Sequence, residues 1–302
     1  VLLLALVMVL SAFSALAEPE KKVIGFYADN VDSYYAAESD ILKKLADRDP
    51  EVNWEIDDKK RFTAHGKDWT LHYYTGIAFD GNTYHIVPQT SDLSINLSDC
   101  SRQGDLVKAP NWKDSRLPVG TRLALRSYHR PHPAVFMEAD IRTLLRNVDV
   151  HYAEGMGLVA QMCTDIHLDG FNVCLAKGSQ RYFTTQADAT HFVQCRGKLI
   201  SENGLYEGMM DDAINVHGVY LRVRQRINNR TLRCRFEHNQ TFGYKWGEPG
   251  DSVVFVRSAT MDQLPFTATI RSINTAGGPI AGTLEYIITL DRDLPEEISD
   301  KE

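Results

Sequence analysis

Val148-Asp149-Val150-His151-Tyr152 is the first of four short apolar segments that decide the fold. The others are Thr164-Asp165-Ile166-His167-Leu168, Thr190-His191-Phe192-Val193 and Ala213-Ile214-Asn215-Val216-His217, with glycines and polar turns between them. Their histidines lie 16, 24 and 26 residues apart (167 − 151, 191 − 167 and 217 − 191). These intervals bracket the length of one coil of a parallel β-helix, in which strands stack about 4.8 Å apart. We therefore expect an all-β chain built around a parallel β-helix.

The texture of the sequence divides the chain into four parts. Residues 1–17 are almost wholly apolar and end in Ala15-Leu16-Ala17, a signal-peptidase pattern, so we expect a partial secretory signal and a secreted or periplasmic protein. A short membrane anchor is the alternative. Residues 18–119 are expected to be an N-terminal region that starts the β-helix, and residues 120–222 its core. Evenly spaced strands and Gly- and Pro-rich turns in residues 223–302 predict an inserted, truncated domain resembling a small β-barrel or sandwich.

Composition limits the possible functions. With 43% hydrophobic and 24% charged residues, the chain resembles folded globular proteins rather than disordered or polytopic membrane proteins. A net charge of −7 gives no electrostatic reason to bind nucleic acid or an anionic membrane, so a neutral partner such as a sugar fits better. The five cysteines form no CxxC pair, and the Asp-x-His steps at Asp149 and Asp165 lack further ligands. We expect neither a metal nor a cofactor.

Three aspartates form the candidate catalytic group. Asp188 lies 23 residues before the first member of the pair Asp211-Asp212 (211 − 188), which is about one coil of a β-helix. Stacking would then bring the three carboxyl groups together. Glycoside hydrolysis needs one carboxyl group as acid and another as base or nucleophile. Adjacent residues of a regular strand point to opposite faces, so both members of the pair reach one cleft only if the backbone bends between them.

Three stretches of the chain resemble glycoside hydrolase family 110. They are Tyr206-Glu207-Gly208-Met209-Met210-Asp211-Asp212-Ala213-Ile214-Asn215-Val216-His217-Gly218, Ala187-Asp188-Ala189-Thr190-His191-Phe192 and His151-Tyr152-Ala153-Glu154-Gly155-Met156-Gly157. The resemblance covers residues 120–223 and implies a fragment of a longer enzyme. It implies a right-handed parallel β-helix with attached β-barrel domains. It also implies an exo-acting, inverting, metal-independent α-1,3-galactosidase that releases terminal galactose from blood-group B type and linear α-galactosyl glycans.

The resemblance assigns Asp188, Asp211 and Asp212 as the catalytic residues. By analogy with pectin-degrading β-helix hydrolases, Asp211 is the expected general acid, and Asp188 and Asp212 hold the attacking water. Inversion then predicts a gap of about 6.5–9.5 Å between acid and base. Further candidates for contacts with the sugar, each weighed against a packing or solvent-exposed role, are His217, Glu154, Glu207, Arg181 and Trp246. Arg126 and Arg130 are further candidates for contacts with sugar hydroxyls, against a role in surface ion pairs.

Two other functions remain open at this point. One is a related hydrolase or lyase that acts on an acidic polysaccharide, as pectinases do, although the net negative charge does not favour it. The other is a non-catalytic β-helix that only binds glycans, in which replacing Asp211 would abolish no activity. The expected partner is an oligosaccharide or glycoconjugate with a terminal α-galactose. The sequence predicts no oligomeric state.

Overall fold

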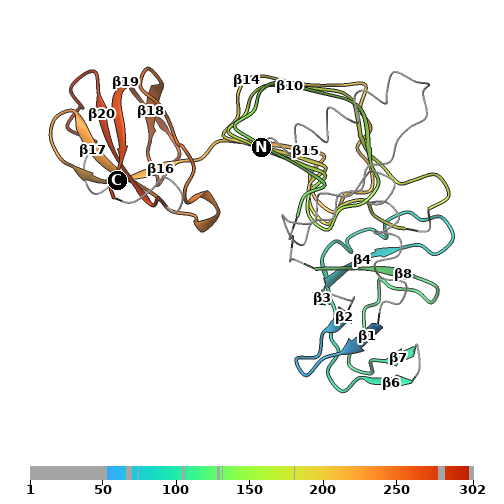
Figure 1. Cartoon of the computed structure of the whole chain (residues 1–302). Helices are drawn as coiled ribbons and strands as arrows, with labels where there is room; N and C mark the ends of the chain where they lie inside the picture. Colours follow the sequence, from blue (N-terminus) through green and yellow to red (C-terminus); the bar gives the residue numbers. More distant parts are fainter. Residues whose placement is uncertain are drawn as a thin grey trace.

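The computed structural model describes residues 53–65, 70–73, 75–103, 106–127, 130, 132–179, 181–277 and 283–298. The expected signal segment, residues 1–17, lies outside them. The described chain is all-β, as expected, apart from the 3-10 helix η2 (Asn239–Thr241). Its strands form three groups: several small antiparallel sheets, then a stack of parallel strands, and last a five-stranded antiparallel sheet (Figure 1). No helix in the described part is long and apolar enough to cross a membrane.

Two parallel sheets occupy the middle of the chain. Consecutive strands alternate between them, so that each circuit of the chain adds one strand to each sheet. Register pairs Val135 with Leu158, Leu158 with Thr190 and Thr190 with Ile214, which gives circuits of 23, 32 and 24 residues (158 − 135, 190 − 158 and 214 − 190). One sheet contains β9 (Val135–Glu138), β11 (Leu158–Gln161), β13 (Thr190–Val193) and β15 (Ile214–His217), and the other β10 (Ile141–Val150), β12 (Thr164–Val173) and β14 (Arg196–Glu202).

The spacing of the four apolar segments suggested that their histidines stack in one ladder, but they do not. His167 belongs to β12 and pairs with Leu144 and Ile200, whereas His191 belongs to β13 in the other sheet. Each circuit contains one strand of each sheet. The histidines of successive segments can therefore lie in different sheets. The strand register, and not the interval between histidines, sets the length of a circuit.

The same bends recur at equivalent positions of successive circuits. Ala139, Met162 and Gln194 follow β9, β11 and β13 and have left-handed φ angles of 54°, 53° and 56°. A second column is formed by Asn147, Gly170 and Asn203, at 53°, 69° and 55°. Asn and Gly adopt this conformation at the least cost. Between the bends, alternate side chains such as Ile166, Leu168 and Phe192 point inward and form a core.

Residues 53–126 differ from the expected start of a β-helix. In the described part of this region every pairing between strands is antiparallel, and parallel pairing begins only at β9. Short connections allow antiparallel neighbours, whereas parallel neighbours need a longer crossover. The sheets are β1-β2-β3 (Asn53–Ile56, Phe62–His65, Thr70–Tyr73), β5-β4-β8 (Leu93–Ser94, Thr75–Phe79, Arg122–Arg126) and β6-β7 (Ser101–Gln103, Leu106–Lys108).

The last group of strands forms a five-stranded antiparallel sheet around its own core. Alternating residues such as Leu232, Phe236, Ile270 and Leu290 are buried there. The strand order is β16 (Leu221–Arg226), β17 (Thr231–Phe236), β20 (Glu285–Leu290), β19 (Gln263–Thr275) and β18 (Ser252–Val256). The evenly spaced strands expected in residues 223–302 are present, and the sheet begins at Leu221.

Close packing between circuits predicts a large effect of a single methyl group at Gly157. A Cβ there would lie 2.5 Å from the carbonyl oxygen of Ala189, a backbone atom that cannot move aside freely. We expect Gly157→Ala to lower the free energy of unfolding by about 2 kcal/mol, measured by urea denaturation. Gly218→Ala is the control, because its Cβ would have no neighbour closer than 3.8 Å. Equal stability of the two variants would contradict this packing.

Candidate active site

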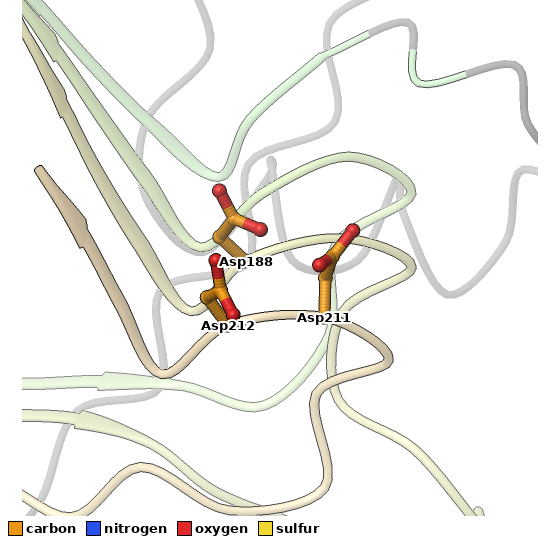
Figure 2. A group of neighbouring side chains, drawn as sticks. All are labelled: Asp188, Asp211 and Asp212. Atoms are coloured by element: carbon orange, nitrogen blue, oxygen red, sulfur yellow. The ribbon is translucent and has the colours of Figure 1, made fainter. Parts of the chain in front are cut away.

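Asp188, Asp211 and Asp212 converge at the ends of two neighbouring circuits. One carboxylate oxygen from each lies within 4.8 Å of those of the other two. Figure 2 shows Asp188 on one turn and the pair on the next, with the three carboxyl groups directed into the same space. Asp188 is buried, with 3% of its surface exposed, whereas Asp211 and Asp212 are exposed. The convergence expected from the sequence spacing is therefore present.

Backbone pairing brings Asp188 beside Asp212. The amide of Ala189 donates to the carbonyl of Asp212 at 2.8 Å, immediately before Thr190 pairs with Ile214 at the start of β13 and β15. Asp211 and Asp212 precede β15 and do not belong to a regular strand. The chain bends after Gly208, which has a φ of +72°, and Met210 is buried. This bend lets adjacent aspartates reach one side, which a regular strand would forbid.

The three carboxyl groups approach one another closely. Their nearest oxygens lie within 4.8 Å of one another, whereas the gap of about 6.5–9.5 Å predicted for an inverting pair is measured between whole carboxyl groups. Asp211 adjoins Asp212 in the chain and Asp188 stacks on Asp212, so all three side chains start from neighbouring backbone positions.

Two arginines from the first antiparallel region and its connection to β9 face Asp211. Nη2 of Arg130 lies 3.1 Å, and Nη2 of Arg126 3.6 Å, from Oδ2 of Asp211. Arg126 ends β8, is only 4% exposed and also donates to Asp92 at 2.8 Å. The positive charge beside Asp211 thus comes from the protein itself.

An apolar cluster holds the first region against the turn that carries the aspartates. Ile77, Phe79 and Ala124 of β4 and β8 pack with Met210, which directly precedes Asp211. Tyr182 also belongs to this cluster, and its ring lies 5.1 Å from that of Phe79. Nearby, Oε1 of the buried Gln186 accepts a hydrogen bond from the amide of Ser127 at 2.7 Å. The candidate site is therefore formed jointly by the first antiparallel region and the parallel sheets.

Asp188 and Asp212 each have a polar partner three residues further on. Nδ1 of His191 lies 2.6 Å from Oδ2 of Asp188, and Nδ2 of the Asn215 side chain donates to Oδ2 of Asp212 at 3.1 Å. His191 and Asn215 are themselves paired in register. Sequence reasoning did not single out His191 or Asn215 as partners of these aspartates. The signal that could have found both is the repeat Asp188-Ala-Thr-His191 and Asp212-Ala-Ile-Asn215.

Two of the expected sugar-contacting residues, Glu154 and Arg181, surround Tyr152. The guanidinium carbon of Arg181 lies 3.9 Å from the centre of the Tyr152 ring, a cation–π contact. Burial, with the negative charge of Glu154, raises the pKa of Tyr73 to about 12 and also raises the pKa of Tyr152. Both phenols therefore remain neutral donors throughout the physiological pH range.

The remaining three candidates lie in different surroundings. His217 is exposed and contacts His191 rather than an aspartate. Glu207 is exposed, and its backbone carbonyl accepts a hydrogen bond from Thr184. Trp246 packs on the core of the last sheet and donates its indole N–H to Val219 at 2.7 Å, beyond the far end of β15 from Asp212. Trp246 is thus not brought to the three aspartates.

Comparisons with known proteins place the chain in a family. Residues 45–123 match the family model GLAA-B beta-barrel domain I, and residues 231–302 match GLAA-B beta-barrel domain II. Alpha-1,3-galactosidase B of Bacteroides fragilis (strain YCH46) is 49% identical over 261 residues, 83% of this chain and 43% of that protein. The chain belongs to the alpha-1,3-galactosidase B family. This confirms the family resemblance seen in the sequence.

Other members of the alpha-1,3-galactosidase B family are similar over the same share of the chain. The protein of that name from Parabacteroides distasonis is 49% identical, over 82% of this chain and 41% of its own length. The one from Akkermansia muciniphila is 34% identical, over 84% of this chain and 32% of its own length. The chain thus spans less than half the length of these relatives.

The buried position of Arg126 predicts that it stabilises the junction beside Asp211. We expect Arg126→Met to lower the free energy of unfolding by about 1 kcal/mol, because Asp92 and Asp211, 46% and 39% exposed, lose a shared counter-charge but stay hydrated. Arg146→Met is the matched control. Its pair with Asp169, 2.8 Å long, is on the surface, with Arg146 59% exposed, and should be worth less than about 0.5 kcal/mol. Chemical denaturation that finds similar losses in both would disprove the assigned role.

Proposed function

We propose that the protein to which this chain belongs is a secreted glycoside hydrolase that removes terminal α-1,3-linked galactose from glycans. The observation that carries this proposal is the convergence of Asp188, Asp211 and Asp212 in a member of the alpha-1,3-galactosidase B family. Two or more carboxyl groups at one opening are what acid- and base-assisted glycoside hydrolysis requires. Export belongs to the same proposal and rests on the apolar residues 1–17.

The proposal includes the architecture. The two parallel sheets, their alternation along the chain and the recurring left-handed bends support a right-handed parallel β-helix over residues 135–217, within the expected range 120–222. The antiparallel strands on either side are proposed to be attached barrel-like domains, in line with the matched models for residues 45–123 and 231–302. The first of these domains would supply Arg126 to the active site.

In the proposed reaction, each aspartate moves or holds one proton. Asp211 gives its proton to the glycosidic oxygen as the bond from that oxygen to the anomeric carbon breaks. Asp188 and Asp212, stacked in register, hold a water and accept its proton as its oxygen bonds to the anomeric carbon. Arg126 and Arg130 lie beside Asp211 and would stabilise the negative charge of its carboxylate once the proton has left. Glu154, Arg181 and Glu207 are proposed to contact sugar hydroxyls.

The family resemblance implies inversion, in which a water attacks the anomeric carbon on the face opposite the leaving group. We favour inversion because Asp188 and Asp212 form a stacked pair able to share one water. Proton NMR of the first product decides this question: β-galactose supports inversion, and α-galactose from an α-linked substrate indicates a covalent intermediate.

The assignment of activity is tested by single Asp→Asn variants at positions 188, 211 and 212. We expect each to lower the rate of galactose release from an α-1,3-linked disaccharide by about 10²–10⁴-fold, because each removes a proton-transfer group. Asp169→Asn, which changes a half-buried aspartate of β12 that pairs with Arg146, should leave the rate unchanged. The assignment is contradicted if the unmodified protein releases no galactose, or releases it equally from α-1,3- and α-1,4-linked disaccharides.

The division of roles is tested with an aryl α-galactoside. A phenolate leaves without protonation, so loss of the general acid should matter little for this substrate. We expect Asp211→Asn to recover most of the parent rate on the aryl substrate, while Asp188→Asn and Asp212→Asn remain slow on both substrates. Recovery by Asp212→Asn instead would make Asp212 the acid.

A further inference from the structure

A chain of hydrogen bonds leads from Asp188 through two histidines to a backbone carbonyl. Nδ1 of His191 lies 2.6 Å from Oδ2 of Asp188, and Nε2 of His191 lies 2.9 Å from Nε2 of His217. Nδ1 of His217 lies 2.9 Å from the carbonyl oxygen of Gly218. The two rings meet edge to face, at 81° with 4.9 Å between their centres. The chain connects the buried Asp188 with the exposed His217.

Counting hydrogens shows that this chain holds an extra proton. The Gly218 carbonyl only accepts, so Nδ1 of His217 carries a hydrogen. Two ring nitrogens 2.9 Å apart need one hydrogen between them, since two lone pairs repel and two N–H groups clash. The 2.6 Å contact of His191 with Asp188 needs a third hydrogen, between Nδ1 and Oδ2. Two neutral imidazoles supply only two hydrogens, so the complete chain contains one proton beyond two neutral histidines and an ionised carboxylate.

The extra proton belongs on the histidines, because an imidazole is a stronger base than a carboxylate. We propose that His191 and His217 are positioning residues that share one proton and so supply the counter-charge of the buried Asp188. The side chain of Asp188 is only 4% exposed and that of His191 17%, so an uncompensated carboxylate at this position would be costly. The positioning role in catalysis rests on the proposed function. The sharing of a proton between His191 and His217 is independent of it.

The other charged groups around the histidines do not take over this role. In the described part of the chain, Arg126 and Arg130 direct their positive charge at Asp211. Asp211 and Asp212, on the next turn, add only negative charge. Cys195 follows β13, and the hydrogen bond with Cys163, with a contribution from His191, lowers the pKa of its thiol. The histidine pair is therefore the cation assigned to Asp188.

This assignment also fixes the direction of Asp188. With Oδ2 held by His191, the other oxygen, Oδ1, remains for the water that Asp188 shares with Asp212 in the proposed reaction. His217 then acts through His191 and need not touch the sugar, in contrast to the contact expected from the sequence. Its removal should slow catalysis without weakening substrate binding.

The shared proton is tested by NMR of the protein labelled with ¹⁵N at histidine, recorded at neutral pH, with signals assigned from His191→Gln, His217→Gln and His167→Gln variants. We expect three protonated ring nitrogens in the His191–His217 pair, and two after Asp188→Asn, because the pair then has no buried negative partner. The matched control is Glu202→Gln, because Glu202 contacts His167 at 2.7 Å but the two side chains are 53% and 35% exposed. That change should leave the number of protonated ring nitrogens of His167 as it is. Two protonated nitrogens in the pair before the Asp188 change, or three after it, would overturn the proposal.

Kinetics distinguish positioning from sugar contact. His217→Ala should lower kcat for galactose release by roughly tenfold or more while KM stays within about twofold, because the carboxylate loses its fixed position. His167→Ala is the control and should change neither. A raised KM with unchanged kcat would make His217 a sugar contact and overturn the proposal. If His217→Ala does not fold, His217→Gln replaces it. If the unmodified protein releases no galactose, the proposed function fails. The NMR measurement still decides whether His191 and His217 share a proton.

Discussion

Hydrogen bonds between the backbones of neighbouring circuits determine the geometry of the candidate site. The amide of Gly157 donates to the carbonyl of Asp188 at 3.0 Å, and the amide of Ala189 donates to that of Asp212 at 2.8 Å. Such bonds keep successive strands about 4.8 Å apart whatever side chains they carry. Acidic residues at stacked positions are therefore forced together, and their mutual repulsion has to be compensated locally. Each aspartate has a different partner for this purpose: His191 for Asp188, the two arginines for Asp211 and Asn215 for Asp212.

Features that depend on local spacing could be predicted from the sequence. The interval between Asp188 and Asp211 predicted their convergence because it matches one circuit, and alternating apolar residues predicted the strands of the last sheet. Features that depend on packing between distant segments could not. Arg126 precedes Asp211 by 85 residues (211 − 126), and nothing in its neighbourhood indicates where β8 packs. The antiparallel pairing of residues 53–126 was missed for the same reason, since short β-like segments look alike in either kind of sheet.

The junction between the first antiparallel region and the parallel sheets joins stability to the geometry of the site. Phe79 and Met210 share one apolar cluster, and Arg126 connects Asp92 with Asp211 across the same boundary. A change in the packing of the first region would therefore move the positive charge beside Asp211 as well as the turn that carries it. The parallel sheets alone determine where Asp188 and Asp212 lie, and the first region completes the surroundings of Asp211.

The unequal circuits suggest how such a scaffold diversifies. The circuit from Leu158 to Thr190 is nine residues longer than the one before it (32 − 23), and the additional length lies between the end of β12 and the start of β13. That connection carries Arg181 and Tyr182, which extend to Tyr152 and Phe79. Residues can be inserted or deleted there without shifting the ladder, because both flanking strands keep their partners. Loops of this kind are free to acquire new ligand preferences during evolution while the acidic centre remains where it is.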